Sequence, residues 1–119
     1  MANVQVSEYR FLNGEMVATG KDSGHPHELP EWKYDESSRV FVISVRNGDG
    51  KEVVIETDFS PCIIKGWKIY RMEKVRLIDG GMFNERKATF SVKGMKRNER
   101  QRIDILVWGP PEKVKIAVK

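Results

Sequence analysis

Short runs of β-branched and aromatic residues, separated by turn signals, are the feature that most constrains this chain. Residues 39–45 (Arg-Val-Phe-Val-Ile-Ser-Val) and 52–57 (Glu-Val-Val-Ile-Glu-Thr) have the composition of strands. Residues 46–51 lie between them and contain two glycines, an asparagine and an aspartate, which tolerate positive φ. Two strands joined by such a segment predict a β-hairpin over 39–57.

Further strands are predicted towards both ends of the sequence. Residues 4–12 and 15–19 flank Asn13-Gly14, a pair that is typical of a tight two-residue hairpin turn. In the last third of the chain, residues 88–92 and 102–108 are strand-like, and residues 114–118 alternate between apolar side chains and lysine or alanine.

Residues 20–38 are predicted to form one long loop. They contain two glycines, two prolines and two histidines, and their large apolar side chains are Leu29, Trp32 and Tyr34. We expect these three side chains to pin the loop to the rest of the fold. A loop of this length in a compact domain is either functional or poorly ordered.

The segment from Ser60 to Asp79 allows two interpretations. A strand from Trp67 to Ile78, broken by a bulge, is favoured by the alternation of Val75, Arg76 and Leu77. The alternative is a single short helix near 61–74, since Ser60-Pro61 is typical of a helix start. Gly66 would lie inside that helix, which speaks against it.

These segments predict an all-β, mainly antiparallel fold of seven to eight short strands, either a small sandwich or a partly open barrel. At 119 residues the chain fits a single β domain over 1–119. Cys62 is the only cysteine, so no disulfide can form within the chain. Because we also find no signal peptide and no apolar run of about 18 residues, we expect a cytoplasmic protein without a membrane partner.

Charge is divided unevenly along the chain. Residues 1–60 contain six Lys/Arg and eleven Asp/Glu, a balance of −5, whereas residues 61–119 contain fifteen and six, a balance of +9. Such asymmetry indicates either an anionic partner for the second half or association between unlike surfaces.

The basic second half predicts contact with the phosphate backbone of a nucleic acid. Five cations crowd the ten residues 93–102, and their mutual repulsion on a hairpin tip would be relieved by a polyanion. Four more precede them in the predicted strand over 67–78. The nine predicted contact residues are Lys68, Arg71, Lys74, Arg76, Lys93, Lys96, Arg97, Arg100 and Arg102. This hypothesis requires that the cations gather on one surface of the folded chain.

Two other functions are compatible with the sequence. One is a protein-interaction or self-assembly module, such as a viral or phage accessory protein, that uses complementary acidic and basic faces. The other is a metal-dependent enzyme centred on His25 and His27, although a zinc site would need further ligands. The sequence has no nucleophile-elbow motif and no phosphate-binding glycine loop, so we expect a non-enzymatic protein with no catalytic residue and no cofactor.

Overall fold

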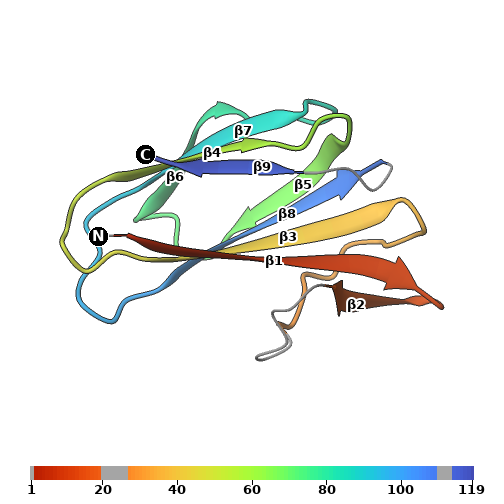
Figure 1. The fold of residues 1–119 in the computed structure, drawn as a ribbon, viewed down its shortest axis with the longest axis horizontal. Coiled ribbons are helices and arrows are strands. Elements are labelled where there is room, and N and C mark those ends of the chain that lie inside the picture. Colours follow the sequence, from red (N-terminus) through yellow and green to blue (C-terminus); the bar gives the residue numbers. More distant parts are fainter. Residues whose placement is uncertain (1, 20–26, 110–113) are drawn as a thin grey trace.

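The computed structural model describes residues 2–19, 27–109 and 114–119. Two antiparallel sheets pack face to face without closing into a barrel, so the predicted all-β, antiparallel fold is confirmed in its sandwich form (Figure 1). The described residues form nine strands, against the seven to eight predicted, and no helix. In particular, they contain no helix that is long and apolar enough to cross a membrane.

The larger sheet, sheet A, has five strands in the order β2-β1-β3-β8-β5. Its strands are β1 (Asn3–Leu12), β2 (Glu15–Thr19), β3 (Ser38–Arg46), β5 (Ile63–Ile69) and β8 (Gln101–Trp108). The smaller sheet, sheet B, has the order β6-β7-β4-β9. Its strands are β4 (Val53–Asp58), β6 (Val75–Gly80), β7 (Lys87–Val92) and β9 (Lys115–Val118).

The hairpin predicted at Asn13-Gly14 is confirmed. Leu12 of β1 pairs with Glu15 of β2, which leaves a two-residue turn. Asn13 and Gly14 have φ angles of 52° and 85°, the positive values that a type I′ turn requires at both central positions.

The hairpin predicted over 39–57 is wrong, although both of its strands exist. β3 pairs with β1 and β8 in sheet A, whereas β4 pairs with β7 and β9 in sheet B. The six residues 47–52 between them are long enough to cross the roughly 10 Å that separates packed sheets. The side-chain amide of Asn47 donates to the carbonyl of Lys51 and so closes this connection locally.

Residues 60–79 are extended rather than helical, so the alternative of a helix near 61–74 is wrong. They form two strands in different sheets, β5 and β6, instead of one bulged strand. A tight turn over 70–74 separates them, because the amides of Lys74 and Val75 both donate to the carbonyl of Arg71. Two register shifts interrupt the segment, one between Ile64 and Gly66 of β5 and one between Leu77 and Asp79 of β6, the second at the end of the range 67–78 for which a bulge is predicted.

The main core fills the space between the two sheets. Sheet A contributes Phe41, Ile43 and Ile105, which alternate with residues that face outwards. Sheet B contributes Ile55 and Phe90, both fully buried. Burial of these apolar side chains is the main source of stability in a fold of this kind.

A second, smaller core lies on the outer face of sheet A. Tyr9, Val40, Val42 and Leu106 point away from the main core and are nevertheless buried. Leu29, Trp32 and Tyr34 of the loop cover them, together with Met16 of β2 and Trp108 of β8. For residues 27–37 this confirms the predicted loop pinned by aromatic residues, while residues 20–26 lie outside the described part of the chain.

Candidate nucleic-acid interface

Three connections between the sheets meet at one end of the sandwich. They are residues 47–52, 70–74 and 93–100, and Figure 1 shows them together at the left. The backbone amide of Lys93 donates to the carbonyl of Lys74 at 2.8 Å, which joins the second and third connections. A Cβ on Gly48 would lie 3.5 Å from the Cα of Arg97, so the first connection touches the third.

The sequence predicts that the basic segment 93–102 forms a protruding hairpin tip, and this prediction is wrong. β7 and β8 belong to opposite sheets, and the segment between them crosses the end of the sandwich. Met95 in its middle is buried in the main core and anchors it. The cations on either side of Met95 stay exposed, so the segment lies flat over the end of the core with its charges outward.

The predicted residues at this end differ in how well their charges are balanced. Lys96, Arg97 and Arg100 are exposed and form no ion pair within the described part of the chain. Arg71 instead pairs with Glu99 at 3.1 Å and with a second carboxylate, that of Glu73. Lys74 Nζ donates to the carbonyl of Gly94 at 2.8 Å.

Lys68 and Arg102 lie on the outer face of sheet A, beside the same end. Lys68 pairs in register with Asp104, and its Nζ lies 4.5 Å from the centre of the Tyr70 ring. The Arg102 guanidinium contacts the same ring at 4.6 Å. Lys68 has no ion-pair partner in the described ranges, whereas Arg102 bonds both oxygens of Asp104 at 2.8 Å.

Asp104 is a fully buried carboxylate whose hydrogen bonds are made by these neighbours. The Tyr70 hydroxyl donates to its Oδ2 at 2.6 Å. Burial, together with this bond, raises the pKa of Tyr70 above its ordinary value. Burial opposes the charge of Arg102, but its bonds to Asp104 outweigh that effect and the pKa of Arg102 is raised. The charge of Arg102 is thus balanced locally.

Arg46 also belongs to this surface, although it is not among the nine residues predicted from the sequence. It is exposed, and together with Arg100 it lines a hollow of about 140 Å³, which Asn3, Gln5, Ser44 and Val45 also line. Arg46 lies in the acidic half of the sequence, so the charge balance of the two halves does not single it out. No local sequence signal places Arg46 beside Arg100, because their meeting depends on the pairing of β3 with β8.

Two predicted residues turn away towards the outer face of sheet B. Lys93 lies 3.6 Å from Glu52. Arg76 pairs in register with Ser91, whose hydroxyl bonds Glu52. The bond from Ser91 and the charge of Lys93 lower the pKa of Glu52. Only some of the nine predicted cations therefore gather on one surface, as the nucleic-acid hypothesis requires.

Only one residue of the predicted histidine pair, His27, lies in the described part of the chain. His25 lies outside the described residues. The backbone amide of His27 donates to the Tyr9 hydroxyl at 2.9 Å, which fixes the start of the covering loop. Across 2–19, 27–109 and 114–119, no group of three or more His, Cys, Asp or Glu side chains is arranged to hold a metal ion.

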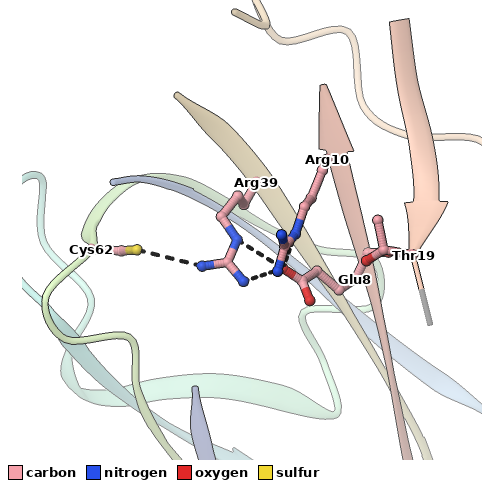
Figure 2. Close-up of polar contacts among 5 residues, drawn as sticks. All are labelled: Glu8, Arg10, Thr19, Arg39 and Cys62. Atoms are coloured by element: carbon pink, nitrogen blue, oxygen red, sulfur yellow. Dashed lines mark hydrogen bonds and ion pairs between the residues drawn. The ribbon is translucent and has the colours of Figure 1, made fainter. Parts of the chain in front are cut away.

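A separate polar cluster lies at the opposite end of β3 (Figure 2). The buried Arg39 guanidinium pairs with Glu8 through Nε at 2.7 Å and through Nη2, and its Nη1 lies 3.8 Å from the Cys62 sulfur. Arg10 bonds the same carboxylate from the solvent side at 3.0 Å. Since Cys62 is fully buried and Glu8 already binds Arg39, we interpret this cluster as structural.

No protein-family model, curated protein or solved structure matches the chain.

Proposed function

We propose that the protein is a non-enzymatic binding module that contacts the phosphate backbone of a nucleic acid. The contact surface is the basic end, which we define as Arg46, Lys68, Lys96, Arg97 and Arg100. One observation carries the proposal: none of these five cations forms an ion pair with another described residue, although they lie close together. They surround one end of the sandwich and the adjoining part of sheet A.

Cations that are paired with carboxylates of the chain attract a phosphate backbone less strongly than cations without an ion pair. The charges of Arg71 and Arg102 are already met by carboxylates of the chain. The five cations of the basic end instead repel one another and attract counterions. A phosphate backbone would replace those counterions, and their release is the main driving force for sequence-independent binding.

Fluorescence anisotropy with a labelled 20-nucleotide single strand tests the proposal. We expect binding at low salt and a linear fall of log K with log salt concentration. If all five cations contact phosphate, the slope is about −3.5, that is, about −0.7 per contact. No binding to single-stranded or duplex oligonucleotides at low salt would overturn the proposal.

Self-association through acidic and basic faces is the alternative. Each sheet, however, combines strands from both halves of the sequence, with β4 among the basic-half strands of sheet B. The charge division of the sequence is thus not a division between the two sheets. Light scattering separates the alternatives, because self-association raises the mass at low salt without any oligonucleotide present.

A further inference from the structure

A hollow of about 320 Å³ opens between the covering loop and the basic end. Its sheet side is formed by Lys68, Tyr70 and Arg102, and its loop side by Leu29 with Glu28 and Glu31. Arg102 bonds the backbone carbonyl of Glu28 at 2.9 Å, so the loop is tied to the sheet at the hollow's edge.

The two glutamates set the chemistry of the loop side. Both are exposed, and neither forms an ion pair within the described ranges. A phosphate group would be repelled by carboxylates in this position. They are instead suited to accept hydrogen bonds from neutral N–H donors, such as the amino group of a base.

The sheet side offers flat surfaces next to cations. The Tyr70 ring is partly exposed, and the planar guanidinium of Arg102 lies over it, 4.6 Å from the ring centre. Unpaired bases stack on aromatic and guanidinium planes, while neighbouring lysines hold the backbone. Lys68 lines the same hollow, so cation, flat surface and acceptor lie within one site.

We infer that the basic end binds single-stranded nucleic acid and that one unpaired base enters this hollow, where Glu28 or Glu31 accepts a hydrogen bond from its amino group. The inference rests on the proposed function and names its substrate class. A duplex does not fit the site. Its bases are stacked and paired, so no single base can enter the hollow while the phosphate backbone contacts the basic end.

Oligo(dC) and oligo(dT) are the matched probes. The two bases have similar size, but cytosine presents an amino donor where thymine presents a carbonyl acceptor. At pH 8, where cytosine is neutral, we expect oligo(dC) to bind about fivefold more tightly than oligo(dT), the factor given by one hydrogen bond of typical net strength. Both should bind more tightly than a duplex of equal length.

The double substitution Glu28→Gln, Glu31→Gln tests the role of the carboxylates. It removes negative charge, so both affinities should rise, but the preference for oligo(dC) should disappear because a glutamine amide can also donate to thymine. Glu73→Gln is the matched control: it removes a carboxylate at the same end but outside the hollow, and should raise both affinities while keeping their ratio.

The outcomes separate this inference from the proposed function. If the wild-type protein binds both oligonucleotides equally, or if the preference survives the double substitution, the inference is overturned while the proposed function stands. Equal or tighter binding to the duplex also overturns it. If no oligonucleotide binds at low salt, both proposals fail together.

Discussion

The Tyr70 hydroxyl lies 2.6 Å from Oδ2 of Asp104 and donates a hydrogen bond to a carboxylate that is entirely buried. The two residues are 34 positions apart in the sequence, and the contact joins the turn after β5 to the middle of β8. It therefore fixes a partly exposed side chain of the proposed interface to the sheet beneath it.

Replacing Tyr70 by phenylalanine should lower the free energy of unfolding by about 2 kcal/mol, because a hydrogen bond to a buried charged group is lost. Urea denaturation measures this change. Tyr34→Phe is the control: its hydroxyl donates to the neutral carbonyl of Pro30, so the loss should be about 1 kcal/mol. Equal losses in the two variants would contradict a special role for Asp104.

The raised pKa of Tyr70 predicts a loss of stability at high pH. In the unfolded chain the phenol loses its proton near pH 10, whereas the folded protein holds it to higher pH. The stabilising contribution is thus complete below about pH 10 and falls as the pH rises through the folded value. The stability difference between wild type and Tyr70→Phe, measured by urea denaturation from pH 8 to 11, should shrink above pH 10. A stability difference that stays constant from pH 8 to 11 would contradict the raised pKa of Tyr70.

Glu8→Ala should destabilise the fold by about 3 kcal/mol, since it removes the carboxylate that faces the buried Arg39 guanidinium. Thermal or chemical unfolding measures the effect. Adding Arg39→Met should recover much of the loss, because an apolar side chain of similar length needs no partner there. A double variant that is less stable than Glu8→Ala would show that Arg39 contributes through packing instead.

Gly80 and Gly14 both have positive φ, but their surroundings differ. A Cβ on Gly80 would lie 2.3 Å from the carbonyl oxygen of Lys87, whereas a Cβ on Gly14 would have no atom within 4 Å. Gly14→Ala should therefore cost about 1 kcal/mol for its backbone conformation alone. Gly80→Ala should cost about 3 kcal/mol, because the β6–β7 pairing must shift as well. Urea denaturation of both variants checks the comparison, and equal costs would contradict it.

Arg97→Ala and Arg100→Ala should each weaken oligonucleotide binding and reduce the salt slope by about 0.7, which is the contribution of one phosphate contact to a single strand. Arg76→Ala removes the same charge from the outer face of sheet B and should leave the slope unchanged. Anisotropy titrations at three salt concentrations give these slopes. A change with Arg76→Ala as large as that with Arg97→Ala would place the contact surface elsewhere.

Strand positions could be predicted from local alternation, but strand partners could not. Residues 46–51 have the composition of a hairpin turn, and the same composition serves a connection that crosses between sheets. One clue was available in the strands themselves. Residues 40–45 are almost continuously apolar, as expected for a strand covered on both faces, whereas residues 53–58 become polar after Ile55. Strands so different in their surroundings need not be neighbours.

The candidate surface was predicted only in part for the same reason. Lys96, Arg97 and Arg100 follow one another in the chain and could be grouped from sequence. The pairing of Lys93 with Glu52 depends on sheet topology, and so does the meeting of Arg46 with Arg100. No local pattern encodes those long-range relationships, which arise only when the two sheets are assembled.

The loop over 27–37 packs Leu29, Trp32 and Tyr34 against the apolar outer face of sheet A. A proteolytic cut within it would leave the strand pairing of both sheets intact, since none of its residues belongs to a strand. Weaker packing of the cut loop would nevertheless expose an apolar patch formed by Tyr9, Val40, Val42 and Leu106. We expect a nicked molecule to keep its circular dichroism spectrum while becoming prone to aggregation, because the packing of the loop over this face would be weakened.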